Sequence, residues 1–129
     1  MLQPDFYSFT SLTTNGSSLL EATLLLNPAH PIFAGHFPAQ PVVPGVCMLQ
    51  IIKEGLEQAV GKSLFLNQAA NIKFLSMLVP AADKEINLRT DFSIATVGEI
   101  LLSSGSLSMY DEYFIKLSNA RYLSASSDE

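Results

Sequence analysis

Apolar residues follow a helical spacing in one long stretch of the chain, residues 45–60. Residues 46–52 are apolar almost all the way round, which is typical of a helix end buried in a core. Gly61 follows directly, and glycine commonly ends helices in a left-handed conformation. The pattern therefore predicts one long helix whose first two turns are buried. We expect its later polar positions to face water, and these are Lys53, Glu54, Glu57 and Gln58.

Elsewhere the pattern changes to a period of two. Residues 86–94 alternate between apolar and polar side chains, as a strand with one buried face does. Turn residues divide the remaining sequence into short segments, and Asn15-Gly16 is a strong signal of this kind. The predicted strands are residues 18–26, one within 63–77, 86–94, 100–110 and 113–123, while residues 6–13 are interpreted as a first short strand or an irregular lead-in.

The order of these elements predicts an α+β fold. One helix cannot cover both faces of a sheet of five or six strands, so we expect an antiparallel sheet wrapped around one long buried helix. A sheet edge or face then remains free to pair with a second copy of the chain. We expect a single domain over residues 1–129, with a core of about 6–123 and a polar tail at 124–129.

Composition narrows the possible partners. The chain has 129 residues, 48% of them hydrophobic, and 7 basic against 12 acidic residues give a net charge of −5. Because there is no basic run, we expect no binding to nucleic acid and none to membranes. No apolar stretch reaches the roughly 18 residues of a membrane span, and the first residues lack a signal-peptide pattern, so a cytoplasmic location is expected. The single cysteine, Cys47, predicts neither an internal disulfide nor a cysteine metal cluster.

Candidate chemistry lies in the long loop over residues 27–44, which holds five prolines. His36 lies in this loop, followed by Pro38, Pro41 and Pro44, and proline rings restrict the backbone φ angles around the imidazole. The loop ends at Gly45, where the predicted helix begins with unpaired N–H groups and a partial positive charge. A histidine beside such donors can move a proton while the backbone stabilises an oxyanion, which points to acyl chemistry.

The stretch Gly35-His36-Phe37-Pro38-x-x-Pro41-Val42-x-Pro44-Gly45-Val46 carries a family resemblance. It resembles the signature of the hotdog-fold β-hydroxyacyl-acyl-carrier-protein dehydratases, which remove water from 3-hydroxyacyl thioesters to give 2-enoyl thioesters. Residues 71–75 and 79–83 show a weaker similarity to the family. In total the resemblance covers about residues 20–123. The resemblance implies a hotdog fold and a hydro-lyase of fatty-acid or lipid biosynthesis.

The resemblance also implies roles for individual residues. His36 would remove the α-proton, and the N–H of Gly45 or Val46 would bind the thioester carbonyl oxygen. The carbonyl of Val42 would accept a hydrogen bond from His36 and fix its tautomer, and Phe37 would line the acyl tunnel. Other residues expected along this tunnel are Met48, Leu49 and Phe74.

Partners and cofactors are likewise implied by the resemblance. The family builds its sites at a homodimer interface, so we expect a homodimer or a higher assembly of dimers. The acyl group would arrive on an acyl carrier protein or as a CoA thioester. Because the phosphopantetheine arm comes with the substrate, we expect no bound cofactor and no metal. An acidic carrier would need basic residues at its docking site. The order of residues in the sequence does not tell which of the seven basic residues lie together in the fold.

The chain departs from the family pattern at Gln50. The family has a glutamate or aspartate fourteen residues after the histidine, and this chain has a glutamine there. A glutamine cannot ionise, although it can hold a water molecule by hydrogen bonds. Gln50 therefore predicts a slow or specialised dehydratase and leaves two alternatives open. One is a hotdog acyl thioesterase, and the other is a non-catalytic acyl-binding subunit that forms a heterodimer with a carboxylate-bearing relative.

Three other residues have simpler interpretations. His30 lies six residues before His36 and is interpreted as a structural or surface residue. Cys47 is interpreted as part of the core, although a helix N-terminus lowers a thiol pKa. Glu54 follows Gln50 by one helical turn and is expected on the solvated helix surface.

Overall fold

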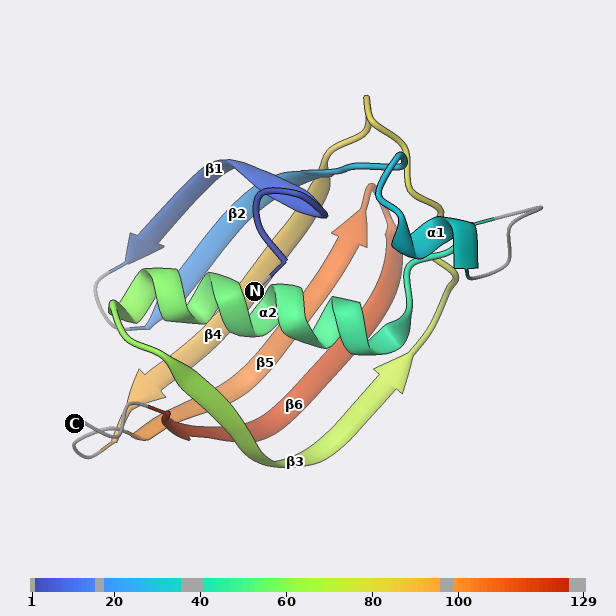
Figure 1. Cartoon of the computed structure of the whole chain (residues 1–129). Helices are drawn as coiled ribbons and strands as arrows, with labels where there is room; N and C mark the ends of the chain where they lie inside the picture. Colours follow the sequence, from blue (N-terminus) through green and yellow to red (C-terminus); the bar gives the residue numbers. More distant parts are fainter. Residues whose placement is uncertain (1, 16–17, 36–40, 96–98, 126–129) are drawn as a thin grey trace.

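The computed structural model of the chain describes residues 2–15, 18–35, 41–95 and 99–125 (Figure 1). His36 and Phe37 lie outside these residues. The described elements in chain order are β1 (Tyr7–Asn15), β2 (Leu19–Leu26), α1 (Ile32–Gly35), α2 (Gly45–Val60), β3 (Leu64–Phe74), β4 (Ile86–Ile94), β5 (Glu99–Met109) and β6 (Glu112–Ser124).

The six strands form one antiparallel sheet in the order β1-β2-β4-β5-β6-β3. The sheet curves around α2, which lies across one of its faces (Figure 1). The apolar positions of the alternating strands point towards α2 and form one core with it. This arrangement confirms the α+β prediction of an antiparallel sheet wrapped around a long helix. Strands β1 and β3 are the two edges of the described sheet.

Helix α2 has the predicted bounds because local signals define both ends. Pro44 precedes it in an extended conformation with φ −61° and ψ 147°, and proline has no N–H that would need a partner. Gly61 adopts φ 76°, and its N–H donates to the carbonyl of Glu57, which closes the last turn. Within the helix, a Cβ on Gly55 would lie 2.5 Å from Leu88 Cδ2, so a glycine here lets the helix lie close to the sheet.

The predicted strands are present with small differences at their ends, and of the two interpretations of residues 6–13 the strand is correct. β1 begins at Tyr7 and continues two residues beyond the predicted range. β3 ends at Phe74, where the N–H of Leu75 donates to the carbonyl of Phe114 and the chain leaves the sheet edge. The predicted strand over 86–94 has the observed bounds of β4.

The loop over 27–44 contains the short helix α1, which the sequence pattern did not predict. Nδ1 of His30 accepts the N–H of Ile32 at 3.1 Å, so the imidazole caps the first turn of α1. The His30 ring also meets the Phe6 ring edge-on at 5.3 Å, and Phe33 stacks on Phe6 at 5.4 Å. His30 is therefore a structural residue that fixes the start of this loop. No helix in the described part of the chain is long and apolar enough to cross a membrane.

Candidate active site

The first turn of α2 offers backbone donors at the end of the proline-rich loop. The N–H groups of Cys47 and Met48 both donate to the carbonyl of Pro44, at 3.0 and 3.2 Å. Within the described part of the chain, the N–H groups of Gly45 and Val46 have no backbone acceptor. These are the two donors proposed from the sequence for an oxyanion. The Val46 side chain is 74% exposed, so this turn is open to a ligand or a second subunit.

An apolar hollow of about 490 Å³ lies beside these donors. We call it the helix-start hollow, and it lies between the start of α2 and the chain that follows β3. Its apolar lining exceeds its polar lining, so it suits an alkyl chain better than a polar ligand. Its lining residues are Val42, Val43, Gly45, Met48, Phe74, Leu75, Ser76 and Met77.

The walls of the helix-start hollow are held together by one backbone bond and one close approach. The N–H of Val43 donates to the carbonyl of Leu78 at 2.8 Å, which ties the loop end to the segment after β3. The Phe74 ring lies over Gly45, where a Cβ would be 2.7 Å from Phe74 Cε1. Of the predicted tunnel residues, Met48 and Phe74 therefore line this hollow, and Leu49 does not.

Gln50 lies away from the helix-start hollow. It follows Gly45 by five residues, which at about 100° per residue places it on nearly the opposite side of α2. Its half-buried side chain donates from Nε2 to Oε2 of Glu54 at 2.7 Å. Within one subunit, the structure therefore brings together Val42, Gly45 and Val46, and it does not bring Gln50 to them. The contacts predicted for His36 and Phe37 fall outside the described residues and stay predictions.

The expectation that Glu54 faces water is wrong. Its side chain is 2% exposed and accepts three hydrogen bonds: from the N–H of Leu2 at 2.8 Å, the hydroxyl of Tyr7 at 2.8 Å, and Gln50. The chain before β1 folds back against α2 (Figure 1), and its Leu2 N–H contacts this carboxylate. Helical periodicity gives no sign of this contact, because the covering residues lie about fifty positions away in the sequence.

Tyr7 and Cys47 show how strongly this side of α2 is desolvated. Burial raises the pKa of the Tyr7 phenol well above its ordinary value of 10.0, and the hydrogen bond to Glu54 and its charge add to the rise. Burial also raises the pKa of the Cys47 thiol, which is 6% exposed. Cys47 is therefore a core residue, as expected, and a poor nucleophile.

Glu57 and Lys53 join the end of α2 to the start of β3. Oε2 of Glu57 accepts the N–H of Leu64 at 2.8 Å and faces Nζ of Lys53 at 3.3 Å. Lys53 also donates to the carbonyl of Leu64 at 3.1 Å. Both side chains are partly covered, so this end of the helix is less solvated than the sequence suggests.

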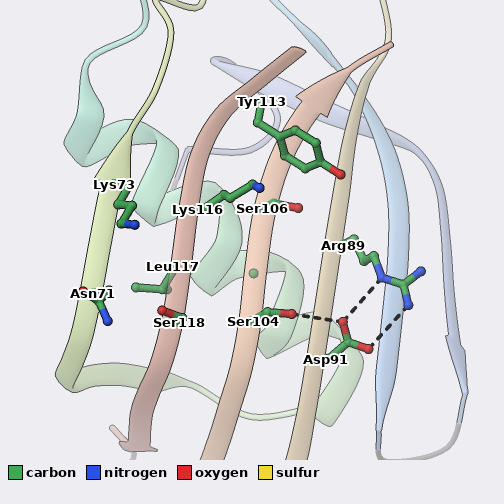
Figure 2. A pocket seen from close by; sticks show the side chains of 11 residues that line it. Asn71, Lys73, Arg89, Asp91, Ser104, Ser106, Tyr113, Lys116, Leu117 and Ser118 are labelled. Atoms are coloured by element: carbon green, nitrogen blue, oxygen red, sulfur yellow. Dashed lines mark hydrogen bonds and ion pairs between the residues drawn. The ribbon is translucent and has the colours of Figure 1, made fainter. Parts of the chain in front are cut away.

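A second hollow of about 410 Å³ lies on the sheet face turned away from α2 (Figure 2). We call it the outer-face groove. It contains none of the residues proposed for catalysis, and its lining is polar and cationic. Three of the seven basic residues of the chain gather here. Its lining residues are Asn71, Lys73, Arg89, Asp91, Ser104, Gly105, Ser106, Tyr113, Lys116, Leu117 and Ser118.

The cations of the outer-face groove differ in their partners. Arg89 pairs with Glu21 at 2.7 Å and with Asp91 at 3.4 Å (Figure 2 shows the Asp91 contact), so its charge is compensated. Lys73 and Lys116 are direct cross-strand neighbours and have no ion pair among the described residues. Nζ of Lys116 lies 4.3 Å from the centre of the Tyr113 ring. Two positive charges without an ion pair in the described part of the chain therefore face outward at the β3 side of the sheet.

In the described residues, no group of three or more histidine, cysteine, aspartate or glutamate side chains could hold a metal ion. The donor set at the start of α2 consists of backbone N–H groups and apolar side chains. Such a set suits a thioester carbonyl with its alkyl chain.

A curved antiparallel sheet wrapped around one long helix, with a hollow at the helix start, defines a hotdog-fold protein. The chain belongs to the ApeI-like family, since the model described as ApeI dehydratase matches residues 12–104. The family resemblance seen in the loop and helix sequence is thereby confirmed. The matched range includes the whole proline-rich loop and α2.

Individual relatives agree with this family. The chain is 33% identical over 75 residues to the 3-hydroxyacyl-[acyl-carrier-protein] dehydratases FabZ of Rickettsia massiliae (strain Mtu5) and Rickettsia bellii (strain OSU 85-389). These matches cover 52% of this chain and 52% of each relative, so the chain spans about half the length of the curated relatives it matches.

Solved structures share the fold at lower sequence identity. The dehydratase heterocomplex ApeI:P from Xenorhabdus doucetiae gives a TM-score of 0.66 at 18% identity, covering 88% of this chain and 96% of that one. The fluoroacetyl-CoA thioesterase FlK gives a TM-score of 0.63 at 8% identity, covering 86% of this chain and 87% of that one. The hotdog fold thus serves both dehydratases and thioesterases among these neighbours.

Proposed function

We propose that the protein removes water from a 3-hydroxyacyl thioester to give a 2-enoyl thioester. The observation that carries this proposal is the helix-start hollow, which joins apolar walls to the N–H groups of Gly45 and Val46, and these have no backbone acceptor among the described residues. The loop holding His36 leads directly into this turn. Membership of the ApeI-like dehydratase family supports the same reaction.

In the proposed mechanism, the imidazole of His36 takes the proton from the α-carbon of the substrate. The electron pair of that C–H bond forms the new double bond, and the bond between the β-carbon and its hydroxyl oxygen breaks. The N–H groups of Gly45 and Val46 bind the thioester oxygen while negative charge develops on it. The departing oxygen takes a proton from the imidazolium and leaves as water, so His36 ends the cycle neutral. None of these proposed steps requires a metal or a bound cofactor.

The acyl chain is proposed to occupy the helix-start hollow, between Met48 and Phe74. The substrate's phosphopantetheine arm would pass over the exposed side chains that border this hollow. Met77 is 76% exposed there, and Leu75 is 48% exposed. Carrying these apolar side chains at the surface is unfavourable unless a ligand or a subunit covers them.

We further propose that the active unit is a homodimer, or an assembly of such dimers, joined at the edge strand β3. Ile72 and Phe74 of β3 are 39% and 54% exposed, and their edge is unpaired within the described sheet. Because Gln50 and Gly45 lie on different sides of α2, a complete site needs a second subunit. His36 of one subunit would then meet Gln50 of the other.

The position and charge of the outer-face groove are consistent with delivery of the substrate by an acidic acyl carrier protein that binds there. Lys73 is adjacent in sequence to Phe74, and the two side chains point to opposite faces of β3. The positive charges of Lys73 and Lys116 thus border the same strand as the helix-start hollow. A carrier could bind there while its arm reaches around the strand end to Gly45.

Two alternatives have specific support. Because Gln50 lacks an ionisable proton, the chain fits a non-catalytic acyl-binding subunit, and the fold neighbour ApeI:P is a dehydratase heterocomplex. The fold neighbour FlK is a thioesterase, and Gln50 is able to hold a hydrolytic water. The products separate the alternatives, since dehydration forms an enoyl thioester and hydrolysis releases a free thiol.

The decisive experiment assays the purified chain with 3-hydroxyacyl thioesters of several lengths. We expect enoyl thioester formation that is abolished in His36→Ala and increased in Gln50→Glu, which restores an acid. Release of free thiol would instead support the thioesterase. Inertness of the isolated chain, with activity on mixing with a carboxylate-bearing hotdog relative, would support the heterodimer. Full activity in His36→Ala would exclude the proposed mechanism.

A further inference from the structure

Glu54 is the only buried charged side chain in the described part of the chain. A buried carboxylate is costly unless hydrogen bonds compensate for the lost hydration. No lysine or arginine pairs with Glu54 among the described residues, and its three donors are the neutral groups of Leu2, Tyr7 and Gln50. Such an arrangement stabilises a single geometry of the groups that point at the carboxylate.

The hydrogen bond from Gln50 fixes which way its amide faces. A carboxylate accepts hydrogen bonds and donates none, so the atom of Gln50 at 2.7 Å from Oε2 must be the amide nitrogen. The reverse orientation would place the amide oxygen of Gln50 against a carboxylate oxygen. The carbonyl oxygen Oε1 of Gln50 therefore points away from Glu54. It accepts no hydrogen bond from any side chain in the described residues.

We propose that Glu54 is a positioning residue that holds Gln50 with its Oε1 turned towards the substrate bound in the helix-start hollow of the second subunit of the proposed dimer. Gln50 then accepts a hydrogen bond from the 3-hydroxyl of the acyl chain. This inference rests on the dehydratase function proposed above. It assigns a role to a carboxylate one helical turn beyond the position where the family has its acid.

The proton balance of the reaction changes accordingly. Because Gln50 accepts and does not give a proton, the proton that leaves with the hydroxyl oxygen comes from the His36 imidazolium. The hydrogen of the 3-hydroxyl stays on its oxygen and points at Oε1 of Gln50. This contact turns an oxygen lone pair towards the imidazolium. His36 therefore carries out both proton transfers, and Gln50 and Glu54 supply orientation.

The test uses the full chain with variants on α2. Glu54→Gln removes the charge that fixes the amide, and Gln50→Met removes Oε1 while keeping the side-chain volume. We expect each variant to lower kcat about tenfold or more with KM within about twofold, since an orienting contact acts mainly in the transition state. The double variant should be no slower than the slower single one, because both remove the same contact. Glu57→Gln is the matched control, since Glu57 also accepts a backbone N–H and does not touch Gln50.

The pH dependence of kcat tests whether a second acid takes part in the proton transfers. Wild-type kcat is expected to fall towards low pH, where a protonated imidazole cannot act as the base, and to show no loss at higher pH. Gln50→Glu should add a second ionisation, seen as a loss of rate at higher pH when the introduced acid loses its proton. A loss of wild-type rate at higher pH would mean that another acid acts. That result would overturn the assignment of both transfers to His36.

Folding and function are separated by two further results. If Glu54→Gln does not fold, Gln50→Met decides the question, because it leaves the donors from Leu2 and Tyr7 in place. An active wild type that requires His36 but tolerates both Glu54→Gln and Gln50→Met would overturn this inference and leave the dehydratase intact. Wild-type and His36→Ala proteins that are equally inert would reject the proposed function, and the inference with it.

Discussion

The ring of Phe74 lies against the backbone of Gly45, so close that a Cβ on this glycine would be 2.7 Å from the ring. Phe74 ends β3, and Gly45 begins α2, so the contact joins the sheet edge to the first turn of the helix. Gly45 is also one of the two proposed oxyanion donors. The ring therefore packs directly against one of the two residues whose N–H groups are expected to bind the thioester oxygen.

Gly45→Ala should displace the Phe74 ring and disturb thioester binding. We expect kcat/KM for 3-hydroxyacyl thioesters to fall by about tenfold, as is typical when a binding contact is misplaced. Phe74→Ala removes the obstructing ring, so the double variant should recover much of the activity lost in Gly45→Ala. A double-variant cycle of kcat/KM measures this coupling. Strictly additive losses would show that the contact has no part in catalysis.

The buried tyrosines should make the fold sensitive to alkaline pH. Burial raises the pKa of Tyr7 and of Tyr122 above the ordinary value of 10.0. Below pH 10 both phenols are protonated in the folded and unfolded chains, so their full contribution to stability is present. Above pH 10 the unfolded chain loses these protons first. The free energy of unfolding then falls by up to about 1.4 kcal/mol per pH unit for each tyrosine.

Urea unfolding between pH 8 and pH 11 measures this fall. Tyr7→Phe should give a shallower decline, because one of the two buried phenols is gone. Its stability at pH 8 should also be lower, since Glu54 loses a donor. Tyr110→Phe, at a position that is 89% exposed, is the matched control, and its curve should run parallel to that of the wild type. A Tyr7→Phe curve with the wild-type slope would contradict the prediction.

Thr90 in β4 offers a stabilising substitution. Its side chain is fully buried, and its hydroxyl oxygen has no hydrogen-bond partner among the described residues. Thr90→Val replaces that hydroxyl by a methyl group of similar shape and should stabilise the fold by about 1 kcal/mol. Urea unfolding at neutral pH measures the gain. Thr23→Val is the control, because the hydroxyl of the half-buried Thr23 forms hydrogen bonds with Thr10 and Ser11, and no gain is expected there.

The sequence predicted α2 well because both of its boundaries depend on local chemistry. Pro44 and Gly61 define its ends through their own backbone preferences. The alternation of residues 86–94 likewise depends only on neighbouring positions, and β4 has the predicted bounds. Elements with such local signals could be predicted from the chain alone.

Features that depend on distant contacts could not be predicted in this way. The burial of Glu54 arises because Leu2 and Tyr7 fold against α2, which no pattern within the helix reports. The position of β3 at a sheet edge follows from its pairing with β6, and antiparallel strands carry no local mark of their partners. The separation of Gln50 from the helix-start hollow also becomes clear only with the helix in place.

Strand β3 is expected to hold the dimer together, and Ile72 lies on its uncovered apolar side. Ile72→Lys places a charge in the proposed interface, so the dimer should dissociate and activity should fall with it. Sedimentation velocity measures the change in mass. Leu101→Lys is the matched control, since Leu101 is similarly exposed but lies on the interior strand β5. A dimer that persists in Ile72→Lys and dissociates in Leu101→Lys would place the interface elsewhere.

The outer-face groove provides the last prediction, which concerns the carrier. Reversing the charges of Lys73 and Lys116 should weaken binding of an acidic acyl carrier protein, because both charges lack ion pairs among the described residues. We expect kcat/KM for a carrier-bound substrate to fall at least about tenfold in Lys73→Glu/Lys116→Glu at low salt. The difference should shrink as added salt screens the exposed charges.

A short thioester without a carrier protein should react at the wild-type rate with this double variant, because the helix-start hollow is unchanged. Lys84→Glu is the matched control, since Lys84 is an exposed lysine that does not line the groove. If Lys84→Glu impairs the carrier-bound substrate as strongly, total charge decides carrier binding. If the double variant impairs the short thioester equally, the two lysines act on the active site itself and the groove is not a docking surface.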